Sequence, residues 1–403
     1  MDEMDRLDEV TEENTGKKSR LKKISKPDGK TVSMLKRVLA LVLTVILVVG
    51  AVFVVVNRDK LNIDHIRRWI AYHNSSGQVA QQVFHGTDLS GSFVWTGNGL
   101  VTCSKQQLQG FDLSGDMVIN QNVNMKKPVL RTEGGYTVVY DAGGTELYLL
   151  HKGEIIQTSQ AGKGRTILSA RVDRDGWLTV VEQAPGYKAS VTVYNEQFQP
   201  VVTENISSSF ITDAIVSPNH KLLTLVSIGE AESGFESVLQ FYNVSDGTLK
   251  STCFLNGDVV LDMKWEKDVL WVAGEYGAYR IVDEALESGY TEANSYMQGF
   301  SLQGSGYALM FYSKYQGGST GELVTVDETG VIGTVGLNDE VLSISASGDY
   351  VAVLTAAELS IYKSDLTLYA SAENTWGARR VLLRNDGSAV VISSESASLY
   401  VPQ

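Results

Sequence analysis

Residues 128–157 read PVLRTEGGYTVVYDAGGTELYLLHKGEIIQ, a pattern of short strands and turns that indicates the fold. It contains short runs of β-forming residues at 128–131, 136–140, 146–150 and 154–157. The runs are separated by Gly134-Gly135, Gly143-Gly144 and Lys152-Gly153. Short strands joined by glycine-rich turns are typical of all-β proteins. The stretch therefore predicts one four-stranded antiparallel unit.

The same pattern recurs along the rest of the chain. We place the starts of the units near residues 92, 128, 166, 210, 259, 298, 340 and 376. The turn after the first run recurs as Asp173-Arg174-Asp175-Gly176, Pro218-Asn219-His220, Ser347-Gly348-Asp349 and Asn385-Asp386-Gly387. Four-strand units that repeat about every forty residues are the sequence signature of a β-propeller. We therefore predict an all-β propeller over residues 78–403.

The last unit is incomplete. It has only three strand-like runs, at 379–383, 389–392 and 398–401. A ring left open there would expose an unpaired strand edge, which native sheets avoid. The run at 79–84, ahead of the first unit, can supply the missing strand. We predict eight blades closed by this N-terminal strand, with seven blades as the alternative if one unit is misread.

Residues 38–56 form a nineteen-residue apolar run that contains fifteen Val, Leu, Ile or Phe. As a helix this run is roughly 28 Å long, about the thickness of a bilayer's hydrocarbon core. Its insertion into the bilayer is favoured by about 4–9 kcal/mol. A signal peptide usually has a shorter apolar core followed by small residues, whereas this run ends in Val-Val-Val-Asn-Arg. We therefore expect an uncleaved transmembrane helix.

Basic residues are unevenly distributed about this run. Nine Lys and Arg lie within residues 17–37, and four lie within residues 58–68. By the positive-inside rule, the N-terminus is expected in the cytoplasm and the C-terminal part outside the plasma membrane. Residues 57–77 then link membrane and propeller. The spacing of Leu61, Ile66, Trp69 and Ile70 fits either a helix at the headgroup level or a short stalk helix.

The charge of the two parts differs. Residues 1–37 carry ten basic and eight acidic side chains, so the totals of 34 and 47 leave 24 and 39 for the remainder, a net charge of −15. We expect the tail to be disordered and its Lys-rich part to lie on anionic lipid headgroups. An acidic body argues against a nucleic-acid partner, because phosphate binding needs a basic footprint.

No catalytic, cofactor-binding or metal-binding signature emerges. The five histidines, including His220, lack metal-ligand spacing with a third donor nearby. Asp173 and Asp175 are interpreted as turn residues, because a calcium loop needs more oxygen ligands. We therefore expect no enzymatic activity, no cofactor and no metal, although the separation of carboxylate pairs for glycoside hydrolysis cannot be read from sequence.

Two further motifs have plain structural interpretations. Residues 317–321, Gly-Gly-Ser-Thr-Gly, match the G-x-S-x-G pattern, but strand-like runs flank them on both sides and no histidine follows. We expect a loop there. Cys103 and Cys253 lie in apolar runs three units apart, so we expect two unpaired, buried thiols.

The loops between second and third strands differ in length from unit to unit. They are long at residues 183–189, 229–236 and 313–321, in units 3, 4 and 6. Equivalent loops of a propeller emerge on one face, where insertions often build a binding surface. The alternative is insertion that is tolerated without a function. The candidate partner-binding residues in these loops are Tyr187, Phe235, Tyr315, Glu230, Glu232 and Glu236.

The order of parts resembles a known architecture. A short basic tail, one apolar span, a juxtamembrane segment with Trp69 and a degenerate quinoprotein-like or WD-like propeller are similar to a family of uncharacterised membrane proteins from Gram-positive, clostridial-type bacteria. The resemblance covers residues 38–403 and rests on architecture, because the Gly-His and Trp-Asp signatures of WD repeats are missing. It implies fold and localisation, and no activity.

Taken together, these features predict an extracytoplasmic propeller, anchored by residues 38–56, that acts as a protein-interaction or scaffold module at the cell envelope. An envelope protein or a glycan is the expected partner. The alternative is a ligand or glycan receptor, or a cell-wall enzyme, that uses the central channel of the propeller.

Overall fold

The computed structural model describes residues 41, 44, 83–84, 91–231, 234–255, 257–292, 294–373, 375, 377–393 and 396–402. The chain divides into two compact units, residues 1–63 and 64–403, and all the strands described below belong to the second. Among the described residues, no helix has the length and apolarity needed to cross a membrane. Except for Leu41 and Thr44, the run at 38–56 lies outside the described residues, as do the tail and the 57–77 linker.

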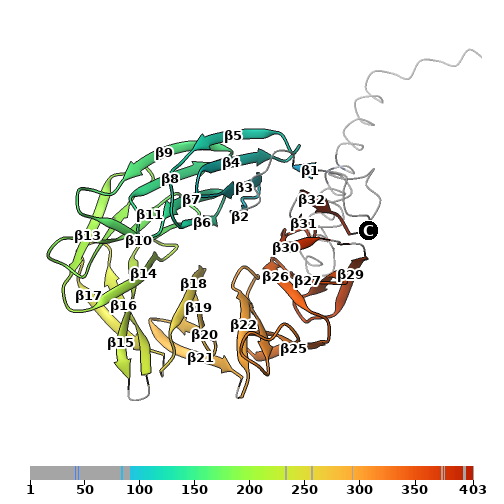
Figure 1. The fold of residues 1–403 in the computed structure, drawn as a ribbon. Helices are drawn as coiled ribbons and strands as arrows, with labels where there is room; N and C mark the ends of the chain where they lie inside the picture. Colours follow the sequence, from blue (N-terminus) through green and yellow to red (C-terminus); the bar gives the residue numbers. More distant parts are fainter. Residues whose placement is uncertain are drawn as a thin grey trace, which may run out of the picture. The chain divides into compact units, whose positions relative to one another are not determined.

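The second unit consists of eight four-stranded antiparallel sheets, which confirms the all-β prediction (Figure 1). Each sheet is one blade. Blade 1 contains β2 (Ser92–Trp95), β3 (Gly99–Cys103), β4 (Gln107–Asp112) and β5 (Met117–Asn122). Blade 2 contains β6 (Pro128–Glu133), β7 (Tyr136–Asp141), β8 (Glu146–His151) and β9 (Glu154–Gln160). Blade 3 contains β10 (Thr166–Val172), β11 (Leu178–Gln183), β12 (Ala189–Tyr194) and β13 (Pro200–Ile206). Blade 4 contains β14 (Phe210–Val216), β15 (Leu222–Ala231), β16 (Gly234–Asn243) and β17 (Leu249–Phe254).

The second half of the ring continues the pattern. Blade 5 contains β18 (Val260–Glu266), β19 (Val269–Gly274), β20 (Gly277–Val282) and β21 (Ala285–Thr291). Blade 6 contains β22 (Tyr296–Ser301), β23 (Ala308–Ser313), β24 (Gly321–Asp327) and β25 (Gly330–Leu337). Blade 7 contains β26 (Val341–Ser347), β27 (Tyr350–Thr355), β28 (Glu358–Lys363) and β29 (Leu368–Glu373). Blade 8 contains β30 (Ala378–Leu383), β31 (Ala389–Ser393), β32 (Ala397–Tyr400) and β1 (Val83–Phe84). The predicted unit starts agree with the observed first strands to within two residues.

The strand that precedes blade 1 completes blade 8. Val83 pairs with Ser398 and Phe84 with Ala397, so β1 is the fourth strand beside β32. The predicted closure by the N-terminal strand and the prediction of eight blades are both confirmed. Pairing the two ends of the repeat removes the free edge that three strands alone would leave.

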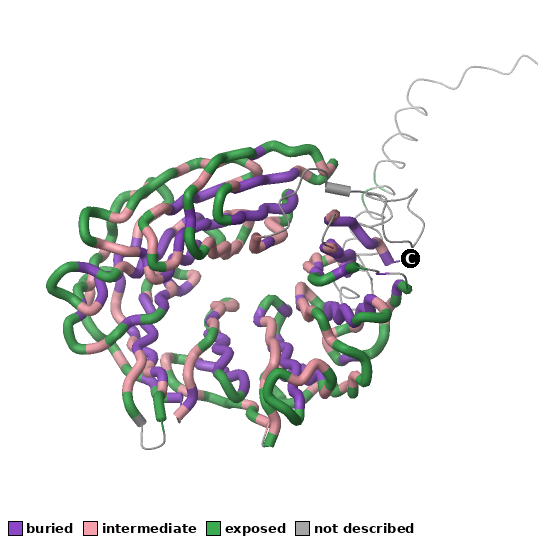
Figure 2. Tube along the Cα trace, in the orientation of Figure 1, coloured by how far each residue is buried: buried purple, intermediate pink, exposed green. Residues whose placement is uncertain are grey.

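The hydrophobic core lies between blades. Eight clusters of buried apolar side chains among the described residues each join two neighbouring blades, and one of them joins blade 1 to blade 8. The middle strands are therefore covered on both faces. In β7, Val138 and Tyr140 pack toward blade 3 while Val139 packs toward blade 1. This is why middle strands are continuous apolar runs, while the fourth strands, such as β9, are largely exposed (Figure 2).

Tight turns bring neighbouring blades together near the channel. Gly134 and Gly135 have φ values of +58° and +88°, the left-handed pair that a two-residue hairpin turn requires. A Cβ added at Gly134 would lie 2.4 Å from the Cα of Arg174 in the next blade. Only glycine fits that approach, which sets the position of the blade 3 turn that carries Asp173 and Asp175.

Two predictions about single motifs are also confirmed. Residues 314–320 form the loop between β23 and β24, as expected for the G-x-S-x-G match. Cys103 in blade 1 and Cys253 in blade 4 are both buried and form no disulfide.

Candidate functional site

Four charged side chains cluster on the first strands of four neighbouring blades. Arg131 is on β6, Arg171 on β10, Asp213 on β14 and Asp262 on β18. We call these four residues the channel network. The register shifts immediately before Asp213 and before Asp262, so a β-bulge directs each carboxylate inward.

Arg171 is the centre of the channel network. Its Nε donates to Asp213 at 2.9 Å, and its Nη2 donates to Asp213 and to Asp262, the latter at 2.6 Å. Its Nη1 donates to the carbonyl oxygen of Met263 at 2.7 Å. Arg131 reaches Asp262 at 2.8 Å, and Ser169 donates to Asp213 at 2.5 Å. The channel network thus ties blades 2, 3, 4 and 5 together across the ring.

The electrostatics of the channel network favour the charged forms. Burial alone raises the pKa of the Asp213 carboxyl, but the charge and hydrogen bonds of Arg171 and the charge of Arg131 lower it below its ordinary value. The pKa of Asp262 is lowered by the same two arginines against the same burial effect. Burial lowers the pKa of Arg171, and the two carboxylates more than reverse this, so its pKa is raised. Two positive and two negative charges leave the channel network neutral.

A cavity of about 330 Å³ adjoins the channel network. Arg131, Arg171 and Asp262 line it together with Trp95 and Trp265. The side chains of Arg131 and Asp262 are 28% and 24% exposed, so both retain access to the cavity. The volume lies at the lower end of the range for small-molecule sites. The cavity can therefore hold a small ligand that carries both an apolar ring and a charged group.

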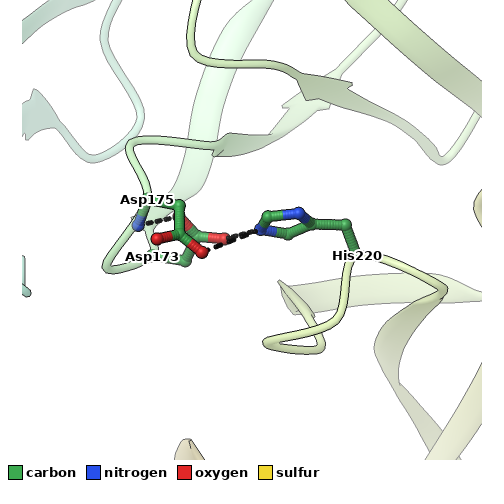
Figure 3. Close-up of side chains that lie close together, drawn as sticks. All are labelled: Asp173, Asp175 and His220. Carbon is green, nitrogen blue, oxygen red and sulfur yellow. Dashed lines mark hydrogen bonds and ion pairs between the residues drawn. The ribbon is translucent and has the colours of Figure 1, made fainter.

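A second group of polar side chains lies between the β10–β11 turn of blade 3 and the β14–β15 turn of blade 4. Nε2 of His220 is 2.8 Å from Oδ2 of Asp173 and 3.6 Å from Oδ2 of Asp175 (Figure 3). The imidazole also stacks on Trp177, with ring centroids 4.1 Å apart. Oδ1 of Asp173 accepts hydrogen bonds from the backbone N–H groups of Asp175 and Trp177, which fixes the turn. These contacts hold the blade 3 turn against the blade 4 turn.

The expectation that no third donor lies near a histidine is wrong for His220. One ligand atom from each of Asp173, Asp175 and His220 lies within 4.8 Å of the others, so the three could hold a metal ion. The interpretation of the two aspartates as turn residues does describe Asp173, whose Oδ1 caps its own turn. Because Asp173 already forms a hydrogen bond with His220, this contact between the two turns explains the close approach of the three side chains.

The candidate partner-binding residues lie on the opposite face of the ring. Antiparallel strands alternate in direction, so the turns between second and third strands lie on the same face as the connections between blades. We call this face the long-loop face; its described residues include 184–188, 229–231, 234–236, 275–276, 292, 294–295 and 314–320. Turns between first and second strands, and between third and fourth strands, form the opposite short-turn face.

The three aromatic candidates on the long-loop face are exposed. Tyr187 is 45% exposed, Phe235 63% and Tyr315 76%. Glu230 is exposed and Glu236 half-buried, whereas Glu232 lies outside the described residues. The residues occupy blades 3, 4 and 6, so they share one face but do not form a single cluster.

One of the three predicted long loops is a different structure. Residues 229–236 were expected to form a loop, but β15 and β16 continue as a paired ribbon, with Gly229 opposite Glu236 and Glu230 opposite Phe235. The ribbon projects from blade 4 (Figure 1). Residues 184–188 and 314–320 are loops as predicted.

The fold and these sites place the chain in a definite class, the eight-bladed β-propellers, with a charged channel network and one face of extended loops. Within that class, the chain belongs to a family of unknown function designated DUF5711, whose sequence profile matches residues 72–365. The sequence resemblance predicted a propeller and a family of unknown function, and both predictions are confirmed. No curated protein matches the sequence.

Solved structures with the same fold are distant in sequence. The C-terminal WD40 domain of Sif2 is 12% identical with a TM-score of 0.57, over 80% of this chain and 99% of that one. The computationally designed Ika8 protein is 10% identical with a TM-score of 0.59, over 81% and 100%. Sqt1 of Saccharomyces cerevisiae is 12% identical with a TM-score of 0.55, over 81% and 100%. At these identities the similarity establishes the fold alone.

Proposed function

We propose that this protein is a protein-interaction scaffold anchored in the plasma membrane by residues 38–56, with the propeller outside the cell and the long-loop face turned to its partner. The bacterial, Gram-positive origin implied by the sequence resemblance is part of this proposal. The observation that carries the binding role is the β15–β16 ribbon. β15 and β16 are each ten residues long and paired throughout, whereas the middle strands of the other blades are four to six residues long, except β24 with seven.

The composition of the long-loop face supports a protein partner. Large exposed aromatics on segments that project from a rigid ring are typical of interface anchors, because they bury much area at little conformational cost. Phe235 and Tyr315 are such residues. The glutamates beside them suit a polar rim. Large aromatic side chains exposed to water would be unfavourable on a face whose only role was to close the ring.

The membrane part of the proposal rests on sequence. Residues 38–56 have the length and apolarity of a transmembrane helix, and the nine basic residues before them favour a cytoplasmic N-terminus. Envelope proteins are the partners that this position makes accessible.

A second candidate function uses the channel. The cavity of about 330 Å³ beside Arg131 supports a receptor for a small ligand, such as a sugar acid, whose ring would contact Trp95 or Trp265. We propose binding without catalysis there, because both carboxylates of the channel network are already neutralised by arginines. This leaves neither carboxylate poised as a general acid.

Purification from native membranes tests the scaffold function. The full chain would be crosslinked in cells, purified through a tag and examined by mass spectrometry. The test variant replaces Tyr187, Phe235 and Tyr315 by Ala. The control replaces three exposed leucines of the short-turn side, 51–62% exposed, by Ala: Leu113, Leu249 and Leu368. We expect specific partners to be lost only from the test variant; equal recovery with both variants would refute the proposed face.

A further inference from the structure

A groove between blades 5 and 6 opens on the long-loop face. Its volume is about 850 Å³, and its walls include Tyr276, Tyr296, Glu292 and Lys314. Tyr276 and Tyr296 are 52% and 50% exposed. The groove therefore offers two accessible aromatic rings beside a carboxylate, in a space large enough for several side chains.

The groove is held in place by a buried carboxylate. Asp258, 2% exposed, accepts hydrogen bonds from the backbone of Glu275 at 2.7 Å and of Tyr276 at 3.2 Å, and from the hydroxyl of Tyr279 at 2.6 Å. The hydroxyl of Tyr312 donates to the carbonyl of Tyr276 at 3.1 Å. These bonds fix the turn that presents Tyr276, so a partner would meet a preorganised wall.

The surroundings of the groove are negative. Tyr290 donates its hydroxyl to Glu292 at 2.7 Å. Burial raises the pKa of Tyr290, and the hydrogen bond to Glu292 and the charges of Glu292 and Glu322 raise it further. Burial and the charge and hydrogen bond of Asp258 likewise raise the pKa of Tyr279. Carboxylates thus add to the effect of burial at both phenols, Glu292 and Glu322 at Tyr290 and Asp258 at Tyr279.

Charge is segregated between two parts of the long-loop face. The connecting segments of blades 1 and 2 on this face carry five basic and no acidic residues: Lys105, Lys126, Lys127, Lys163 and Arg165. The described connecting segments of blades 4, 5 and 6 carry five acidic residues and one lysine: Asp258, Glu275, Glu292, Asp339, Glu340 and Lys314. Such a division selects both the charge and the orientation of a partner.

We infer that the groove between blades 5 and 6 binds an extended, arginine-containing segment of the partner protein. This inference rests on the proposed function and names the chemistry of its partner. A guanidinium stacks on a tyrosine face and pairs with a carboxylate at the same time, which matches Tyr276, Tyr296 and Glu292. Glu275, exposed beside Tyr276, can pair with a second basic residue of the segment.

Fluorescence anisotropy with a labelled nona-arginine peptide tests the inference on the full chain in detergent. The groove variant carries Glu275→Gln and Glu292→Gln. The control carries Glu154→Gln and Glu196→Gln, two exposed glutamates beside turns of the short-turn face, with the same change of net charge. We expect the groove variant to bind about fivefold more weakly and the control to change less than about twofold. Tyr296→Ala should weaken binding about threefold without a change of charge.

The outcomes distinguish a failure of the inference from a failure of the proposed function. Equal weakening by both double variants would mean that the peptide senses only net charge. Equal binding of a nona-glutamate peptide would exclude a cationic site. If no peptide binds but the Tyr187, Phe235 and Tyr315 variant still loses its partners in cells, the arginine segment is wrong and the scaffold function stands. If the groove variant loses peptide binding while the Tyr187, Phe235 and Tyr315 variant retains its partners, the groove is supported. The role of those three aromatic residues in partner binding is then refuted.

Discussion

Replacing Arg171 by Met should destabilise the propeller more than any exposed substitution. Arg171 makes two hydrogen bonds to Asp213, one to Asp262 and one to the carbonyl of Met263, and its side chain is 9% exposed. The substitution keeps most of the volume but leaves the buried carboxylate of Asp213 and the half-buried carboxylate of Asp262 with Arg131 as the remaining cation of the channel network. Breaking a buried ion pair in this way costs about 3–5 kcal/mol.

The matched control is Arg165→Met. Arg165 pairs with Glu182 at 2.8 Å, but its side chain is 34% exposed, so the loss should be below about 1 kcal/mol. Urea unfolding of the full chain in detergent, followed by tryptophan fluorescence, gives the midpoints. If Arg171→Met shifts the midpoint no more than Arg165→Met does, the channel network does not hold the blades together.

The pH dependence provides an independent check. In the wild type the pKa of Asp213 is lowered on folding, so its contribution is present above the unfolded value of about 4 and is lost as the pH falls through the folded pKa. In Arg171→Met, burial dominates and raises that pKa above the unfolded value, so the variant gains relative stability as the pH falls. The difference in unfolding free energy between the two proteins should therefore narrow from pH 7 to pH 4. A constant difference would contradict the electrostatic explanation.

Three further results are expected. Protease added to intact cells should remove the C-terminal part and leave an N-terminal fragment; complete protection would contradict the proposed orientation. Val83→Pro should lower the thermal midpoint and increase self-association measured by light scattering, because β1 loses a ladder hydrogen bond beside β32; an unchanged protein would show that β1 does not close the ring. Replacing residues 229–236 by Asn-Gly should leave the circular dichroism and thermal midpoint close to wild type while abolishing partner recovery; a large loss of stability would mean that the ribbon serves the fold.

Much of the fold is local in the sequence and could therefore be predicted. Each blade is a meander of short strands, so its order follows directly from runs and turns, as in residues 128–157. Closure followed from the missing fourth strand of blade 8. The β15–β16 ribbon was mistaken for a loop because glycine and serine interrupt residues 229–236, although their cross-strand pairing continues.

The sites depend on contacts that the sequence does not encode locally. Arg131 and Asp262 are 131 residues apart, and their meeting depends on three blade-to-blade rotations and on the bulge before Asp262. Asp173 and His220 were each recognised as turn residues of successive units. Their contact across 47 residues could have been suggested by aligning equivalent turns of neighbouring blades, which the repeat makes adjacent.

Photo-crosslinking in native membranes shows whether the protein binds its partner through the long-loop face. A benzophenone amino acid would be placed at position 235 or 315 on the long-loop face, and at position 249 or 368 on the short-turn side. All four side chains are between 51% and 76% exposed, so the two pairs of positions differ more in the face that they occupy than in solvent exposure. We expect a discrete crosslinked protein from 235 and 315 and none from 249 and 368. The same products from both sides, or none from 235 and 315, would contradict a scaffold that binds through its long-loop face.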